Sequence, residues 1–265
     1  MPSPEPVDDP SDPRLADYAD LNDPQRRRRL EAARGFLVAE SPHVVRHLVQ
    51  SGRPVRSVLV TPQQYEGLVD VLAELDAPVY VASEAVLRRV VGFDLHRGAV
   101  AAADRWPLPS VADVVRGARR IAVLEHVNDH ENLGVLFRSA AALGIDAVLL
   151  DPTCSDPLYR RTVRVSIGQV LTLPWTRVDG LDVVRRAGFS LVACTPARDA
   201  QPLETVAWPE QVALLFGEEG YGLSDAWLDA ADTRVRIVMR NGVDSLNVAT
   251  AASIVFYACV SSPTT

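Results

Sequence analysis

Short apolar runs alternate with longer amphipathic segments over most of the chain. Between residues 36 and 103 the apolar runs are rich in valine and alanine, which is typical of buried strands. Ser41-Pro42 is typical of a helix start, because serine caps free amides and proline fits the first helical turn. The alternation predicts a small α/β domain. We expect its strands at Val55–Thr61, Val79–Ala82 and Ala99–Ala103 and two of its helices at Gln64–Leu75 and Glu84–Val91.

The same alternation returns between residues 113 and 262. Apolar runs separated by helical patterns predict a mostly parallel sheet with helices on both faces, because each crossover helix covers the sheet. We expect its strands at Arg120–Leu124, Asp146–Asp151, Leu171–Trp175, Phe189–Cys194, Val212–Phe216 and Val235–Met239. The last helical stretch, Leu246–Val260, is apolar nearly all round, which predicts burial on more than one side and a subunit interface.

Four segments follow from these patterns. Residues 1–22 are rich in Pro and Asp and lack apolar periodicity, so we expect a disordered or loosely attached arm. The small α/β domain occupies residues 23–105, and the proline-rich stretch at 106–117 is expected to be a linker. The larger α/β domain occupies residues 118–265.

Composition narrows the class of protein. The formal charge of −7 excludes a basic coat protein for nucleic acid, so any RNA contact must come from local patches. The basic run Arg26–Arg29 is either a solvated helix face or such a patch. Cys154, Cys194 and Cys259 lie far apart, which favours a reducing compartment without disulfides or a zinc site. With no signal peptide or membrane-length apolar run, we expect a cytoplasmic protein that does not bind membranes.

Candidate chemistry gathers after two of the expected strands. The loop Gly217–Gly222 has three glycines in six residues, which lets backbone amides approach a ligand closely. Glu218-Glu219 inside this loop argues against a phosphate cradle and suits a ligand with a positive centre or donor groups. Ser245 and Asn247 stand where helix N-caps stand, so free amides are expected near them.

The sequence predicts neither a metal site nor a dinucleotide-binding site. His126 and His130 have a spacing that metal ligands use, but they lie in an expected loop without a clear third ligand, so no metal site is predicted. A dinucleotide-binding oxidoreductase would carry G-x-G-x-x-G after the first strand of a domain, and neither domain has it.

Three motifs, in this order and spacing, resemble the SpoU/TrmH family of the SPOUT superfamily, which are RNA ribose 2′-O-methyltransferases. They are Asn132-x-Gly134-x-x-x-Arg138, Gly217-x-Glu219-x-x-Gly222, and Ile237-x-Met239 followed by Ser245-Leu246-Asn247-Val248. The resemblance covers about residues 118–260, and the first domain is more loosely similar to the family's ribosomal-protein-like substrate-binding domain. Val238 stands where the family usually has proline, and Glu218 where it often has asparagine.

The resemblance implies a trefoil knot, a homodimer in which two chains build each site, and S-adenosylmethionine as cofactor without a metal. It assigns catalytic roles to Arg138, Asn132, Glu219, Ser245 and Asn247. It assigns cofactor binding to Thr195, Gly217, Ile237, Met239 and Leu246. If residues 132–138 form one helix, we expect Asn132 and Arg138 to point to nearly the same face.

The expected function is therefore transfer of a methyl group to an RNA ribose 2′-hydroxyl. A guanidinium is almost never neutral in a protein, so Arg138 is expected to anchor a phosphate and polarise the hydroxyl rather than to act as a base. The separate first domain favours rRNA over tRNA as substrate. A non-catalytic RNA-binding dimer that keeps the fold is the alternative.

Overall fold

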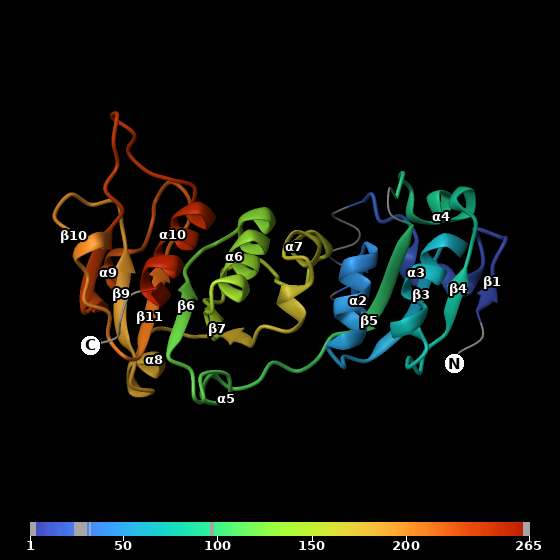
Figure 1. Cartoon of the computed structure of the whole chain (residues 1–265), viewed down its shortest axis with the longest axis horizontal. Coiled ribbons are helices and arrows are strands. Elements are labelled where there is room, and N and C mark those ends of the chain that lie inside the picture. Colours follow the sequence, from blue (N-terminus) through green and yellow to red (C-terminus); the bar gives the residue numbers. More distant parts are fainter. Residues whose placement is uncertain (1–3, 24–30, 32, 96–97, 262–265) are drawn as a thin grey trace. The chain divides into compact units, whose positions relative to one another are not determined.

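The computed structural model describes residues 4–23, 31, 33–95 and 98–261, and the chain divides into two compact units (Figure 1). The first unit comprises the chain up to Trp106 together with Leu158–Thr172. The second comprises Pro107–Pro157 and the chain from Leu173 onward. The basic run Arg26–Arg29 lies outside the described residues. None of the helices in the described ranges combines the length and hydropathy that a bilayer crossing requires.

The first unit is built on a five-stranded sheet in the order β1-β4-β3-β5-β2. Neighbouring strands β1, β4 and β3 run parallel, whereas β5 is antiparallel to both β3 and β2. Its strands are β1 (Glu5–Pro6), β2 (Phe36–Glu40), β3 (Val55–Val60), β4 (Val79–Val81) and β5 (Ala99–Asp104). Among the described residues up to Trp106, its helices are the 3₁₀ helix η1 (Pro13–Tyr18), α2 (Pro42–Gln50), α3 (Pro62–Leu72) and α4 (Glu84–Val91).

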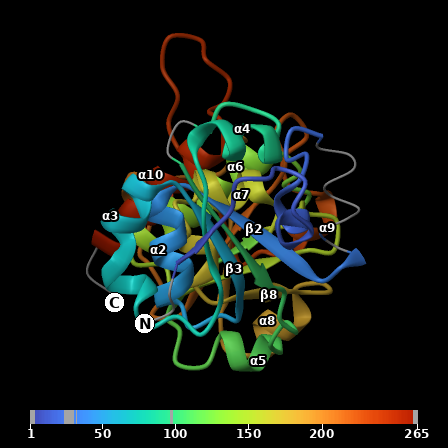
Figure 2. The ribbon, with the colours of Figure 1, turned by 90° about the vertical axis from the view of Figure 1, so that its right-hand side faces the viewer.

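Side-chain caps mark the starts of α3 and α4, whereas the Ser41 hydroxyl makes no capping hydrogen bond at the start of α2. The Thr61 hydroxyl accepts a hydrogen bond from the Gln64 amide, and Pro62 fits the first turn of α3 because it needs no amide partner there. The Ser83 hydroxyl caps α4 in the same way by accepting from the Val86 amide. Helices α2 and α3 pack side by side, as the view in Figure 2 shows.

The N-terminal segment differs from the expected loose arm. Strand β1 pairs with β4, and the side chains of Leu15, Tyr18 and Leu21 are almost fully buried in the core of the first unit. The Tyr18 hydroxyl lies 2.6 Å from the Ser57 hydroxyl. The segment is rich in Pro and Asp, so its composition does not indicate a packed structure. Three apolar residues, each three positions apart, are nevertheless enough to fix a short segment.

The first unit also includes Leu158–Thr172, which stands between two strands of the second unit in sequence. This segment forms α7 (Arg160–Val165) and the 3₁₀ helix η2 (Gln169–Leu171). Arg160 donates to the buried Glu40 carboxylate at 2.6 Å and to the Leu21 carbonyl at 2.8 Å. The contiguous domain expected at residues 118–265 therefore differs from the observed second unit.

The second unit holds a seven-stranded sheet in the order β10-β12-β9-β11-β6-β7-β8, in which all neighbours are parallel. This confirms the expected α/β class with a parallel sheet. The strands are β6 (Arg120–Leu124), β7 (Ala147–Leu150), β8 (Trp175–Arg177), β9 (Ser190–Cys194), β10 (Gln201–Pro202), β11 (Val212–Phe216) and β12 (Thr233–Arg236).

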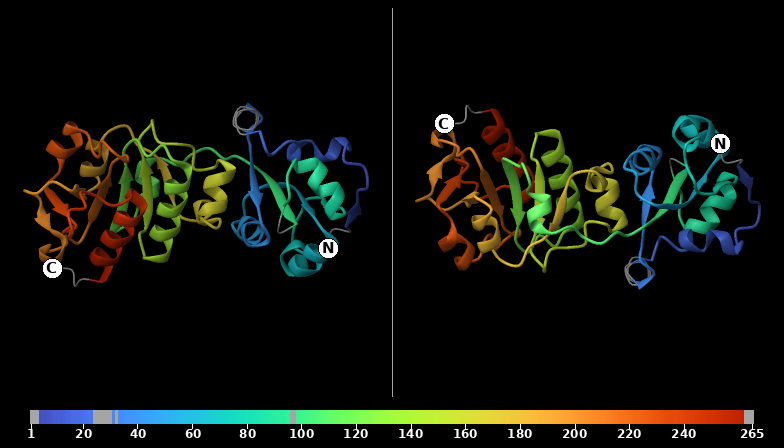
Figure 3. Two further views of the ribbon diagram at one scale, coloured as in Figure 1. Left: turned by 90° about the horizontal axis from the view of Figure 1, so that it is seen from above. Right: turned by 90° about the horizontal axis from the view of Figure 1, so that it is seen from below.

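Helices cover both faces of this sheet. Side chains of Ile121, Val123 and Leu215 pack toward one face with the short helices α5, α8 and α9. On the other face Phe256 packs edge-on against Phe216, with ring centroids 5.5 Å apart. There α6 and α10 lie side by side, as the view from above in Figure 3 shows. The helices are α5 (Val111–Val114), α6 (His130–Ala142), α8 (Asp182–Arg186), α9 (Asp225–Ala230) and α10 (Val248–Ser261), with the 3₁₀ helix η3 (Leu203–Thr205).

Two expected strands are displaced. The stretch expected at Leu171–Trp175 contains Pro174, which has no amide to donate, and β8 begins only after it. The stretch expected at Val235–Met239 ends as a strand at Arg236, and Ile237 to Met239 belong to a loop. The apolar run continues past the strand because Ile237 and Met239 line a cavity instead of a sheet.

Burial of the N-terminal segment predicts a stability effect. Leu15→Ala should lower the free energy of unfolding of the first unit by about 2–5 kcal/mol, because it removes a buried side chain and leaves a cavity. Val69→Ala, at a valine of α3 in the same unit that is 38% exposed, is the control and should change this free energy by less than about 0.5 kcal/mol. Denaturant titration measures both free-energy changes. Equal changes for the two variants would indicate that the N-terminal segment is loosely attached.

Candidate active site

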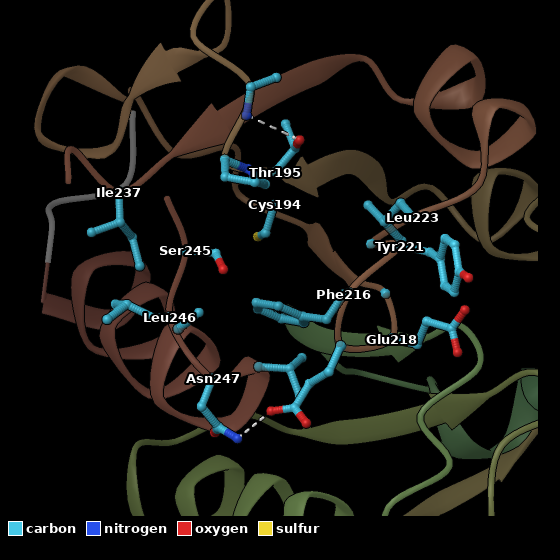
Figure 4. A pocket seen from close by; sticks show the side chains of 18 of the residues that line it. Cys194, Thr195, Phe216, Glu218, Tyr221, Leu223, Ile237, Ser245, Leu246 and Asn247 are labelled. Atoms are coloured by element: carbon cyan, nitrogen blue, oxygen red, sulfur yellow. Dashed lines mark hydrogen bonds between the residues drawn. The ribbon is translucent and has the colours of Figure 1, made fainter. Parts of the chain in front are cut away.

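A cavity of about 730 Å³ opens at the carboxyl ends of β9, β11 and β12 and at the first turns of α10 (Figure 4). Strand β11 lies between β6 and β9, both of which precede it in the chain. Ligands of open α/β sheets bind at the carboxyl edge near such a change in strand order. The topology therefore makes this cavity the candidate site of the second unit.

The glycine loop Gly217–Gly222 folds back on itself beside the cavity. The Gly222 amide donates to the Glu218 carbonyl at 3.1 Å, and the same two residues form an isolated antiparallel bridge. A Cβ atom on Gly217 would lie 2.1 Å from the carbonyl carbon and oxygen of Gly222, so no other residue fits here without moving backbone. The buried Glu125 carboxylate fixes the end of the loop, because it accepts from the Ser224 amide at 2.8 Å and its hydroxyl at 2.6 Å.

The five residues expected to bind the cofactor all line this cavity: Thr195, Gly217, Ile237, Met239 and Leu246. The Thr195 amide donates to the Val235 carbonyl at 2.9 Å, which joins the ends of β9 and β12. Within the described residues, the main-chain groups of Ile237, Met239 and Leu246 make no backbone hydrogen bond. These groups are therefore open to a ligand.

Sequence patterns missed the apolar wall of the cavity. Phe216 and Cys194 line it from the ends of two strands, and Val248, Ala251 and Val255 line it from α10. The last three recur at i, i+3 and i+7, which is a helical face that could have been recognised once the helix start was known. Burial raises the pKa of the Cys194 thiol, so it stays neutral near pH 7.

Asn247 joins three parts of the site. Its side-chain oxygen accepts from the amides of Ala249 at 3.0 Å and Thr250 at 3.2 Å, so it caps α10 as expected. Its side-chain nitrogen donates to Asn132 Oδ1 at 2.8 Å and to Glu219 Oε1. The second of these bonds is drawn in Figure 4.

Four of the five expected catalytic residues therefore gather at one place. Asn132, Glu219 and Asn247 are joined by hydrogen bonds, and Ser245 lines the cavity beside Asn247. Ser245 makes no side-chain hydrogen bond within the described residues, so it is not the helix cap that its position suggested.

Arg138 lies apart from this group. Its side chain is exposed on α6, does not line the cavity, and makes no hydrogen bond or ion pair in the described part of the chain. The expectation that Asn132 and Arg138 share a face is wrong, since six residues turn a helix by about 600°, which leaves their faces about 120° apart. Arg138 instead lies about 60° from the exposed Val135.

The charge of the cavity wall is acidic. Glu218, Glu219 and Asp244 belong to it, and no Lys or Arg is among the described residues that line it. Such a wall suits a cationic or donor-rich ligand and disfavours a phosphate, as the glycine loop indicated.

His126 and His130 are placed differently from a paired metal site. His130 is the first residue of α6, whereas His126 Nδ1 lies 3.1 Å from the Asp151 carboxylate and 2.9 Å from the Thr153 hydroxyl. Burial opposes ionisation of Asp151, but hydrogen bonds from Thr153, Cys154 and His126 outweigh it and lower the pKa of this carboxyl. No group of three or more His, Cys, Asp or Glu placed to hold a metal occurs in the described ranges.

Comparison with known proteins tests the resemblance. A family model described as the SpoU rRNA Methylase family matches residues 119–257. A Mycobacterium tuberculosis protein named as an uncharacterized tRNA/rRNA methyltransferase is 49% identical over 258 residues, covering 95% of this chain and 90% of that protein. A Bacillus subtilis protein named 23S rRNA (guanosine(2553)-2′-O)-methyltransferase is 28% identical over 225 residues, covering 84% of this chain and 87% of that protein.

Among solved structures, that of an AdoMet-bound rRNA methyltransferase from Sinorhizobium meliloti superposes with a TM-score of 0.82 at 23% identity, covering 97% of each chain. It supports the fold. Because the family model spans more than half of the chain and the segment that forms the cavity, the chain belongs to the SpoU rRNA methylase family and is a methyltransferase.

Proposed function

We propose that this protein transfers a methyl group from S-adenosylmethionine to an RNA ribose 2′-hydroxyl, with rRNA as the preferred substrate and tRNA as the second choice. The observation that carries the proposal is the hydrogen-bonded group of Asn132, Glu219 and Asn247 at the rim of the cavity. The name of the Bacillus subtilis relative supports both the 2′-hydroxyl and rRNA. The cytoplasm, favoured by the scattered cysteines, is its proposed location.

The cavity fits the proposed cofactor. Its volume of about 730 Å³ is within the range of sites for ligands of this size. The open main-chain groups of Ile237, Met239 and Leu246 would hold the adenine and ribose between apolar side chains, together with Thr195 and Gly217. The acidic wall suits a sulfonium. When bound, S-adenosylmethionine supplies a methyl group that is already activated.

The hydrogen bonds suggest how the side chains share the work. Asn247 uses its oxygen for the amides of α10 and its nitrogen for Asn132 and Glu219, so it is a positioning residue. The amide nitrogen of Asn132 and the second oxygen of Glu219 remain to orient the ribose. Holding the hydroxyl in line for transfer replaces a bimolecular encounter by a positioned one.

Arg138 would act on the phosphate next to the target ribose. A guanidinium stays protonated, so it neutralises charge and polarises the hydroxyl but does not take its proton. Because Arg138 and Val135 lie toward the same exposed side of α6, we propose that Arg138 meets the substrate beside a subunit interface.

A homodimer through the second unit is part of the proposal. Ile254 and Tyr257 on α10 are 38% and 64% exposed, and Val135 on the adjacent α6 is 37% exposed. Burying such a face stabilises association by about 25 cal/mol per Å² of apolar area before entropic costs. The trefoil knot stays a prediction of the resemblance, as does RNA binding by the first unit.

The decisive experiment compares 2′-O-methyl positions in total RNA from cells with and without the gene. Loss of one position, restored by purified protein and S-adenosylmethionine, would support the proposal and identify the substrate. An unchanged map, with RNA binding but no transfer, would instead favour the non-catalytic RNA-binding dimer.

Arg138→Ala should lower single-turnover methyl transfer by about 10²-fold or more, because a positioned charge is lost from the reaction. Cofactor affinity, measured by calorimetry, should barely change. Arg138→Lys should restore little, since a point charge cannot reproduce the planar fork. Arg186→Ala, at another exposed helical arginine of the second unit, is the matched control. Near-wild-type transfer by Arg138→Ala would move the role to Glu219 or Ser245.

Ile254→Asp should yield monomer and lose activity, because it places a charge on the exposed face of α10. Phe256 is fully buried against Phe216, so a charge there would test folding instead. Val69→Asp is the control, since Val69 is also 38% exposed but lies on α3 of the first unit. Light scattering measures the mass of each variant, and a fully active Ile254→Asp monomer would contradict the shared site.

Methyl transfer should proceed at the same rate with and without EDTA. The reason is chemical, because the methyl group of a sulfonium needs no Lewis acid to make it a good electrophile. Methyl transfer to RNA is measured before and after dialysis against the chelator. Loss of activity that zinc restores would return His126 and His130 to consideration as metal ligands.

A further inference from the structure

The glycine loop carries two side chains to which the proposed reaction gives no contact with the RNA, Glu218 and Tyr221. The Tyr221 side chain is 91% exposed, so it contributes almost no buried area to the fold. Glu219 is bonded to Asn247, whereas the Glu218 carboxylate makes no hydrogen bond or ion pair in the described part of the chain. Both residues nevertheless belong to the cavity wall.

The loop holds Tyr221 outward on a closed turn. Gly220 and Gly222 on either side of it have φ values of +97° and +75°, and the Gly222 amide closes the turn onto the Glu218 carbonyl. Figure 4 shows the Tyr221 ring and the Glu218 carboxylate on the side of the site opposite Ser245 and Leu246. An aromatic ring and a carboxylate are thus presented together to solvent at the rim.

We propose that Tyr221 stacks on an unpaired nucleobase of the RNA at or beside the methylated nucleotide, and that Glu218 accepts hydrogen bonds from the donor edge of that base. The inference rests on the proposed function, since it takes RNA as the substrate. Proteins that read single-stranded RNA stack its bases on aromatic side chains and bond their Watson–Crick edges.

The charge of the loop indicates that it contacts the base of a nucleotide and not its phosphate. Two adjacent carboxylates, Glu218 and Glu219, repel a phosphate, whereas a base offers N–H donors. Guanine presents two neighbouring donors, N1–H and the 2-amino group, which match the two oxygens of one carboxylate. Adenine, cytosine and uracil each present a single donor group at this edge. The Glu218 carboxylate therefore favours guanine over the other three bases.

The test uses seven-nucleotide oligoribonucleotides of uridine with one central guanosine, inosine or adenosine, and the protein saturated with S-adenosylhomocysteine. Fluorescence anisotropy measures the affinity. Tyr221→Ala should weaken binding of the guanosine oligonucleotide about tenfold, and Tyr221→Phe should keep it within about twofold, because stacking needs the ring and not the hydroxyl. Calorimetric affinity for S-adenosylhomocysteine is measured for both variants, so that weaker RNA binding is distinguished from a loss of cofactor binding.

Inosine isolates the role of Glu218, because it lacks only the 2-amino group of guanosine. Wild-type protein should bind the guanosine oligonucleotide at least about tenfold more tightly than the inosine one, which is the worth of one hydrogen bond to a charged group. Glu218→Gln should bind the two with nearly equal affinity.

Equal affinity of wild type and Tyr221→Ala would overturn the inference, and so would failure of the wild type to bind any of these oligonucleotides. Light scattering of Tyr221→Ala is the further control, since a change of mass would assign the ring to a subunit contact instead. No methyl transfer enters these measurements, so a failure of the proposed catalytic activity would leave their outcome readable. Conversely, an active enzyme that binds the guanosine oligonucleotide no more tightly than the others would contradict the base contact and leave the proposed activity supported.

Discussion

The side chain of Asn247 holds the site together. Its oxygen caps the first turn of α10, and its nitrogen is shared between Asn132 on α6 and Glu219 in the glycine loop. Three segments that are far apart in sequence are thus fixed by one amide group. A side chain with one acceptor and two donor hydrogens can do this, whereas a carboxylate or a hydroxyl of similar size cannot. The cavity depends on this arrangement, because α10 and the glycine loop form two of its walls.

Backbone geometry also determines the shape of the site. Gly217 is in contact with the backbone of Gly222 and Leu223, so the chain turns back immediately after β11. The buried Glu125 then fixes Ser224, where α9 begins. The turn is therefore held at both ends, and only its tip, with Tyr221, faces solvent.

The sequence predicted the central strands well, because strands such as β6 and β11 are continuous apolar runs buried on both faces. The sequence also indicated the ligand site, because the loops that line the cavity follow such strands. It failed where the fold overrides local pattern. Ile237, Val238 and Met239 form an apolar run typical of a strand, but they belong to a loop in which Ile237 and Met239 line a cavity. The polar N-terminal segment is held by only a few buried side chains. The faces of Asn132 and Arg138 differ because six residues on one helix are separated by about 120°, an angle that follows from the sequence spacing alone.

The segment Leu158–Thr172 belongs to the first unit although the chain before and after it belongs to the second. The chain passes between the two units three times, after Trp106, after Pro157 and after Thr172. A gene segment that ends at Trp106 would therefore encode a first unit without α7, and the buried Glu40 would lose the partly buried Arg160 that neutralises it. The residues of the two units are interleaved in sequence, so neither unit is encoded by one uninterrupted stretch of the gene.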